Sequence, residues 1–242
     1  MGGCLSRRKA DVLAEDHLSS REPKPEPPRF SACSILFNAG IPALIWLEDA
    51  LAYYGVPTMV FELFLLVPDV DAAARVLKSS GYQKREPSLA LRPICQFDNL
   101  YAAVRTENQH PPTTDAEATS QSPEVKPTRV ILLPAKEWFH ELPSAPEDME
   151  DWLPTLPQLL AALIAKWLSL EEGERDLRLR IAVLLGYIYA GLDNVKLPGF
   201  EQQLPQQLRA FHMDRVQGRI NLADLGTFRC QQHYLHPRNE QP

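Results

Sequence analysis

The sequence predicts an α+β core that is followed by a helical C-terminal part. Two short and almost entirely apolar runs, at 59–67 and 130–133, are typical of strands covered on both faces. After residue 155 the apolar residues recur instead at every third or fourth position, which indicates amphipathic helices. With 242 residues and 45% hydrophobic content, the chain can bury one good core or two small ones.

Residues 1–29 are predicted to be a flexible N-terminal segment that carries a lipidation motif. The first six residues, MGGCLS, fit the pattern for N-myristoylation of Gly2. Cys4 is a candidate for palmitoylation, and the basic run 7–9 follows it. One myristoyl chain binds a membrane only marginally, so a second chain or a basic cluster is needed for stable anchoring. We expect a protein tethered to the cytoplasmic face of a membrane. The alternative is an accidental match in a soluble cytosolic or nuclear protein.

Residues 30–142 are predicted to form the α+β core, after a proline-rich spacer at 21–28 that should be extended. The first element, at 31–38, consists of small and apolar residues and is expected to be a short helix or strand. Gly40 is expected to end it, because glycine readily adopts the backbone conformations that break regular structure.

A helix is expected at 43–54, because apolar residues recur there at spacings of three and four. Gly55 supplies a left-handed residue to end this helix, and Pro57 prevents its continuation. The strand predicted at 59–67 contains one carboxylate, Glu62. A carboxylate inside an apolar strand is costly unless it is paired or faces a cleft, so Glu62 is a candidate site residue.

The rest of the core is less regular. Asp69 or Asp71 is expected to cap a helix that extends to Gly81. A further strand is predicted at 101–105. Residues 106–127 are rich in Pro, Thr, Ser and acidic residues and lack periodic apolar positions, so we expect a flexible surface insertion.

Residues 143–228 are predicted to form the helical C-terminal part. Amphipathic helices are expected at 156–168 and 177–192, joined by a short acidic connection, and a third helix is expected from 206 to 213. The remaining residues, 229–242, are predicted to be a polar tail.

Composition and charge exclude several classes of function. A formal net charge of −6 argues against general nucleic-acid binding. Four widely separated cysteines, with no Cys-x-x-Cys pair, suit a reducing compartment and form no disulfide framework. No secretory signal and no apolar run of membrane-spanning length is visible.

Two further patterns give no support for catalysis or metal binding. The triplet Cys230, His233 and His236 has chelating residue types but no clear fourth ligand, so an ordinary polar tail is the preferred interpretation. The chain also has no Gly-x-Ser-x-Gly sequence for a nucleophile elbow.

The helix, the Gly-Val-Pro-Thr turn and the buried strand together resemble the nucleotidyltransferase-like fold. The residues that carry this resemblance are ALAYYGVPT at 50–58 and ELFLLV at 62–67. In active members a Gly-Gly or Gly-Ser pair precedes a strand with Asp-x-Asp. A later strand adds a third carboxylate, and two metal ions position a nucleoside triphosphate. The resemblance covers roughly 30–135 and implies a mixed sheet with helices. The chain is also similar to a group of proteins from filamentous fungi, some of which occur in variable accessory gene clusters linked to hyphal surface and colony morphology.

The sequence departs from the pattern of the active members at the glycine pair, at the Asp-x-Asp positions and at the third carboxylate. Glu62 and Phe64 fall on the Asp-x-Asp positions, Ala39-Gly40 keeps half of the glycine pair, and no acid lies between 128 and 135. Magnesium requires near-octahedral oxygen coordination, and two-metal phosphoryl transfer requires several convergent carboxylates. We therefore expect a pseudo-nucleotidyltransferase with no catalytic residues, no metal site, no cofactor and no measurable nucleotidyl transfer.

The candidate cleft residues are Glu48, Asp49, Glu62 and Phe64, and the expected partner is a protein or a small ligand of unknown identity. Phe64 should be buried, and it should share a strand face with Glu62, because residues two apart on a strand point the same way. Two alternatives stay open. One is an unorthodox metal-dependent nucleotidyltransferase that uses Glu48, Asp49 and Glu62, and the other is a soluble interaction scaffold.

Overall fold

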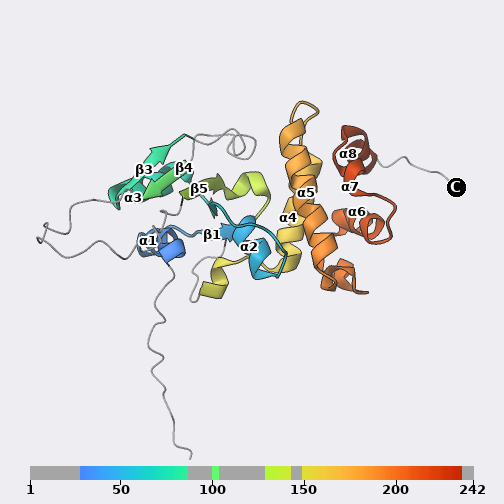
Figure 1. The fold of residues 1–242 in the computed structure, drawn as a ribbon, viewed down its shortest axis with the longest axis horizontal. Coiled ribbons are helices and arrows are strands. Elements are labelled where there is room, and N and C mark those ends of the chain that lie inside the picture. The colour runs from blue at the N-terminus through green and yellow to red at the C-terminus, as the bar shows by residue number, and fades with distance from the viewer. Residues whose placement is uncertain (1–27, 87–99, 104–128, 143–148, 236–242) are drawn as a thin grey trace, which may run out of the picture.

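The structure is a computed structural model that describes residues 28–86, 100–103, 129–142 and 149–235. A mixed α/β part lies beside a helical part, and the long helices α4 and α5 stand between the sheet and the last three helices (Figure 1). The elements of the first part are the helices α1 (Ser31–Asn38), α2 (Glu48–Tyr53) and α3 (Val70–Ser79) and the strands β1 (Leu44–Trp46), β2 (Leu63–Val67), β3 (Tyr82–Arg85), β4 (Leu100–Ala103) and β5 (Arg129–Pro134).

The five strands form one mixed sheet in the order β1-β2-β5-β4-β3. Strands β2 and β5 are parallel, and the other neighbouring pairs are antiparallel. Every residue of β2 is buried. Leu63 and Leu65 pack in the cluster with α1 and α3, whereas Phe64 and Leu66 pack in the cluster with α4 and α5. The prediction of a mixed α and β protein with a doubly covered strand is therefore confirmed.

The helix predicted at 43–54 is wrong in its first half. Leu44–Trp46 forms β1, which pairs with β2, and Leu47 adopts a positive φ of 51° before α2 begins. The spacing of the leucines fits a helix, but all five residues from 43 to 47 are buried. A strand paired with β2 accommodates this continuous burial, whereas an amphipathic helix would expose one face. The predicted stop is confirmed, because Gly55 has a φ of 84° and follows Tyr54, the residue that caps the end of α2.

The strand predicted at 59–67 is shorter than expected. Its first three residues, Met59, Val60 and Phe61, lie in a loop and are exposed by 70%, 36% and 59%. The registers of β1 and β5 pair with β2 only from Leu63 onward, so the described strands offer these three residues no ladder partner. Exposed apolar side chains in this loop become important for the site.

The other predicted elements of the core are largely confirmed. Residues 31–38 form the helix α1, and Gly40 follows it with a φ of 72°. Asp69 caps α3 by accepting a hydrogen bond of 3.0 Å from the backbone N–H of Ala72. The strand predicted at 101–105 is present as β4, while residues 104–105 and the insertion 106–127 lie outside the described residues. Strand β3 was not predicted, because three of its four side chains are polar and exposed.

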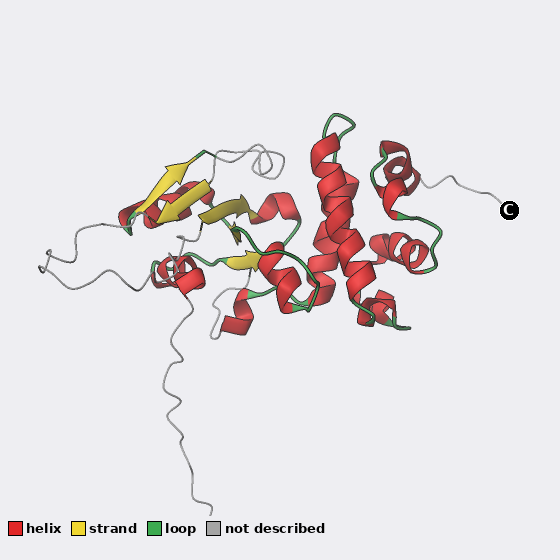
Figure 2. Ribbon diagram, in the orientation of Figure 1, coloured by secondary structure: helices red, strands yellow, loops and turns green. Residues whose placement is uncertain are grey.

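The helical part consists of α4 (Leu156–Ser169), α5 (Arg175–Gly191), α6 (Gln206–Val216), α7 (Leu222–Leu225) and α8 (Phe228–Leu235), and Figure 2 shows that the strands are confined to the other side of the molecule. Thr155 and Gln158 form a capping box at the start of α4. The helices predicted at 156–168 and 206–213 lie within α4 and α6, and the one predicted at 177–192 matches α5 to within two residues at each end, so these three predictions are confirmed.

The predicted polar tail begins later than residue 229, because residues 228–235 form α8. Gln231 of this helix is fully buried and donates a hydrogen bond of 2.8 Å to the carbonyl of Leu168. Its side-chain oxygen accepts one of 2.9 Å from buried Arg178. A buried polar residue that is satisfied in this way gives no apolar signal in the sequence, so the helix escapes prediction.

One hydrophobic cluster joins the helical part to the face of the sheet that carries Phe64 and Leu66. It runs from Trp46 and Phe64 to Trp167 and Leu185 without a break. The hydroxyl of Tyr54 also donates a hydrogen bond of 2.6 Å to the carbonyl of Pro154, across the boundary expected near residue 143. No helix in the described ranges is both long and apolar enough to cross a membrane.

Candidate functional site

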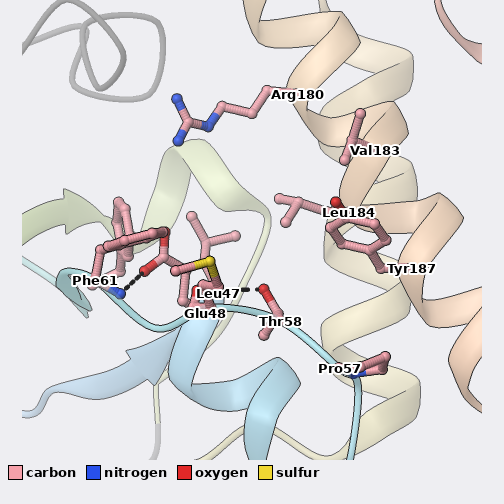
Figure 3. A pocket seen from close by; sticks show the side chains of 11 residues that line it. Leu47, Glu48, Pro57, Thr58, Phe61, Arg180, Val183, Leu184 and Tyr187 are labelled. Atoms are coloured by element: carbon pink, nitrogen blue, oxygen red, sulfur yellow. Dashed lines mark hydrogen bonds between the residues drawn. The ribbon is translucent and has the colours of Figure 1, made fainter.

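A pocket of about 350 Å³ lies between the loop that precedes β2 and one face of α5. The loop contributes Met59 and Phe61, and α5 contributes Arg180, Leu184 and Tyr187 (Figure 3). The side chains of Leu47, Glu48 and Phe64 complete most of the lining. The pocket is therefore built from segments that lie about 120 residues apart in the sequence, with a mainly apolar surface.

The loop is held in place at both ends. At its start, a Cβ added to Gly191 would lie 3.1 Å from Cδ of Pro57, so the glycine at the end of α5 permits this close approach. At its other end, the Glu48 carboxylate accepts hydrogen bonds of 2.7 Å and 3.2 Å from the backbone N–H groups of Phe61 and Glu62. Glu48 thus satisfies two donors for which the described strands offer no partner.

Glu62 lies next to the pocket but does not line it. Its side chain is buried and forms an ion pair with Arg129, which begins β5 beside it in the parallel register. Burial raises the pKa of the Glu62 carboxyl, and the positive charge of Arg129 opposes that rise. The second carboxylate oxygen, Oε2, has no hydrogen-bond partner within the described part of the chain.

Asp49 of α2 forms a second ion pair, with Arg29. Arg29 donates from Nε and Nη2 to the two Asp49 oxygens, at 2.7 Å and 2.8 Å. The same Nη2 donates to the backbone carbonyl of Glu62 at 3.0 Å. Hydrogen bonding to Asp49 raises the pKa of Arg29, so the guanidinium stays charged and ties Arg29 to α2.

The four predicted cleft residues lie in one region of the structure, but they make different contacts. Phe64 is fully buried, as expected, and it lines the pocket together with Glu48. Asp49 instead forms an ion pair with Arg29, and Glu62 forms one with Arg129. Among the residues that the structure describes, no group of three or more acidic, histidine or cysteine side chains is arranged to hold a metal ion. A metal-dependent transferase that uses Glu48, Asp49 and Glu62 would require all three to leave their present contacts.

The second set of chelating residue types is also not assembled. Cys230 lies half-buried in α8, where burial and the nearby Asp224 and Asp214 raise the pKa of its thiol to about 11. A thiol of this kind is a poor metal ligand, because the ligand is the thiolate. His236 lies outside the described residues.

The sequence did not point to Met59, Phe61, Arg180, Leu184 or Tyr187 as site residues. Two signals were nevertheless present. The apolar run at 59–61 precedes a charged residue, and Arg180, Leu184 and Tyr187 recur at spacings of four and three on one helix face. Only the position of α5 beside the loop that precedes β2 shows that these two features meet.

Comparisons with known proteins gave no relative: the sequence matches no family model, and no curated protein or solved structure is significantly similar to it. The class of protein is therefore defined by the fold and the pocket alone. It is a mixed α/β protein with a helical C-terminal part and an apolar pocket between the two.

The raised pKa of Glu62 predicts how stability depends on pH. The folded state holds this proton more tightly than the unfolded state does. The stabilising contribution is therefore complete below the ordinary glutamate pKa of about 4.3 and is lost as the pH rises through the raised value. Glu62→Gln removes the titration. Urea unfolding should show the stability advantage of the wild type over Glu62→Gln shrinking as the pH rises above about 4.

The Arg129→Met background supplies the control for this pH prediction. Arg129 lowers the pKa of Glu62, so its removal should make the loss of stability with rising pH larger. If the wild type instead gains stability over Glu62→Gln as the pH rises, the ion pair outweighs burial and the expected direction is wrong.

Proposed function

We propose that this protein is a non-catalytic, nucleotidyltransferase-like binding protein that is tethered to the cytoplasmic face of a membrane by N-terminal acylation. The observation that carries the proposal is the pocket beside Phe64. Its position adjoins the residues that align with the Asp-x-Asp pattern, yet its lining is mainly apolar. A binding role for this cleft is consistent with that lining, because ligand pockets are mostly apolar with a few polar groups.

The nucleotidyltransferase-like frame is supported by the order of elements around the turn. Helix α2, the Gly55 stop and the loop with Pro57 lead into the buried strand β2, and α3 follows. The strand is an interior strand of a mixed sheet with helices on both faces. These features agree with the arrangement implied by the resemblance at 50–67.

The non-catalytic character is supported by the contacts of the carboxylates. Glu48 binds backbone N–H groups, Asp49 binds Arg29 and Glu62 binds Arg129. Two-metal phosphoryl transfer needs carboxylates that share metal ions about 3.5–4 Å apart. Oxygens already engaged with protein cations or amides are less available for that coordination.

The tether is proposed from the N-terminal sequence. Gly2 and Cys4 are the acylation sites, and the basic run 7–9 adds attraction to an anionic leaflet. By its similarity to the fungal group described above, the protein would act in hyphal surface or colony morphology.

The binding role is tested on purified protein with two assays. One adds magnesium and nucleoside triphosphates and measures pyrophosphate, and the other adds an amphipathic fluorescent probe with an apolar ring system. We expect no release of pyrophosphate, and we expect saturable binding of the probe 8-anilinonaphthalene-1-sulfonate. Phe61→Ser should weaken probe binding by about tenfold, because it removes apolar surface from the pocket wall.

Phe139→Ser is the matched control for this experiment. Phe139 is exposed by 57%, close to the 59% of Phe61, but it does not line the pocket. Its substitution should leave probe binding unchanged. Metal-dependent release of pyrophosphate that disappears in Glu62→Gln would show that the protein is an enzyme and overturn the proposal.

A further inference from the structure

We propose that the pocket binds a small amphipathic carboxylate, with its apolar body between the loop and α5 and its carboxylate at Arg180. This inference rests on the proposed function, since it names the ligand class of the same pocket.

The apolar side chains that face the pocket are unusually exposed for their size. Met59, Phe61 and Tyr187 are exposed by 70%, 59% and 47%. They come from both walls, with Met59 and Phe61 on the loop and Tyr187 on α5 (Figure 3). A ligand between the two walls would cover all three at once. The gain from removing apolar surface from water is about 25 cal/mol per Å², so an apolar ligand body is favoured.

The polar end of the ligand is defined by Arg180. On α5, Arg180, Leu184 and Tyr187 lie on one face because they are spaced by four and three residues. Arg180 and Tyr187 are thus separated by about two turns, or roughly 10 Å along the helix. Figure 3 shows the Arg180 side chain extending from α5 at one end of this face, with Tyr187 farther along the helix. An apolar body along the face would place its end group beside the guanidinium.

A carboxylate is the end group that fits this position. A guanidinium is always charged and has five N–H donors, so it can bind a carboxylate in addition to the contacts that it makes within the protein. Glu48 is the other charged residue of the lining, and its carboxylate already accepts the backbone N–H groups of Phe61 and Glu62. Among the described residues of the lining, Arg180 is the one cation, and a single cation favours a single negative charge rather than the several charges of a triphosphate.

The volume favours a small molecule over a peptide. At about 350 Å³ the pocket lies near the lower end of the range for small-molecule sites, which is about 300–1,000 Å³. A helical peptide ligand requires a groove that takes side chains over two or more turns. The ligand class is therefore a medium-chain fatty acid or an aryl-substituted carboxylic acid.

The test compares octanoate with octan-1-ol, which has the same chain but no charge. Binding is measured by displacement of the fluorescent probe from unacylated protein. The wild type should bind octanoate more tightly than octan-1-ol. Arg180→Met should weaken octanoate binding by about tenfold and leave octan-1-ol binding within about twofold, because a charge-assisted contact is lost while the apolar stem is kept. Leu184→Ser should weaken both ligands.

Two further variants keep the result interpretable. Arg175→Met changes an exposed arginine of the same helix that does not line the pocket, and it should leave both affinities unchanged. Arg180→Lys keeps the charge and should retain part of the preference for octanoate, which a merely structural role of Arg180 would not predict. Thermal unfolding of each variant establishes that it is folded at the temperature of the binding measurement.

The outcomes separate this inference from the proposed function. Equal affinity for the two ligands, or no effect of Arg180→Met, overturns the carboxylate proposal while the probe still reports a binding pocket. If the probe itself does not bind, the proposed binding role fails as well. If unacylated protein binds octanoate but myristoylated protein does not, the protein's own myristoyl group occupies the pocket. The natural occupant is then not a free carboxylate, and the proposal is wrong.

Discussion

Phe64→Asp is expected to lower the free energy of unfolding by more than about 4 kcal/mol and to restore no nucleotidyl transfer. Phe64 is fully buried, and its neighbours in the sheet are Trp46 on β1 and Ile131 on β5. An aspartate at this position would lose the ring contacts and place a carboxylate among apolar side chains. The substitution would complete an acidic pair with Glu62 in sequence, but Glu62 is already paired with Arg129.

Phe64→Leu is the matched control, since it keeps an apolar side chain at the same site and should cost only about 1.5 kcal/mol. Urea unfolding of the wild type and both variants measures the difference, and a pyrophosphate-release assay on folded protein measures activity. Near wild-type stability for Phe64→Asp would mean that the pocket admits water to this position. Metal-dependent activity in the same variant would contradict the proposed loss of catalysis.

The strand around Phe64 shows which parts of the fold the sequence could predict. The run 63–67 has no polar residue, and only a strand covered on both faces can bury such a run. The helices α4 and α5 were predictable for a similar reason, because their apolar periodicity is sustained over more than three turns. Local pattern and tertiary packing agree in these elements.

The error at 43–47 shows where local pattern is insufficient. The leucines at 44, 47 and 51 have helical spacing, yet the chain changes from strand to helix at Leu47 through a residue with positive φ. Non-glycine residues seldom adopt this conformation, and no sequence signal marks Leu47 for it. Pairing of β1 with β2 decides the structure there, and that pairing is a tertiary interaction.

The candidate site was predictable in part. Glu62 and Phe64 attracted attention because a carboxylate and an aromatic ring fall on the metal-binding pattern, and Phe64 does line the pocket. The role of Glu48 as a cap for the loop depends on the close approach of α2 to Phe61. The contribution of Arg180 and Tyr187 to the pocket depends on the position of α5 beside the loop that precedes β2. A single sequence does not show that α2 comes close to Phe61 or where α5 lies. The wall of the pocket formed by α5 could therefore be identified only from the structure.

Gly2→Ala is expected to move the protein from the membrane fraction to the soluble fraction. The substitution removes the myristoylation site, and with it the membrane encounter that would permit acylation of Cys4. Each buried acyl methylene contributes about 0.8 kcal/mol, and each basic residue near an anionic leaflet about 1 kcal/mol. The run 7–9 alone would then supply about 3 kcal/mol, which is roughly a hundredfold in affinity and insufficient for stable anchoring without an acyl chain.

The measurement is fractionation and imaging of the protein with a tag at its C-terminus, which leaves Gly2 accessible. Gly3→Ala is the matched control, because the myristoylation pattern accepts any residue at that position, and the variant should stay at the membrane. Cys4→Ser should give an intermediate population, since one acyl chain with a basic cluster binds reversibly. If the wild type is already entirely cytosolic or nuclear, the N-terminal match is accidental, and the protein is a soluble interaction scaffold whose pocket acts away from membranes.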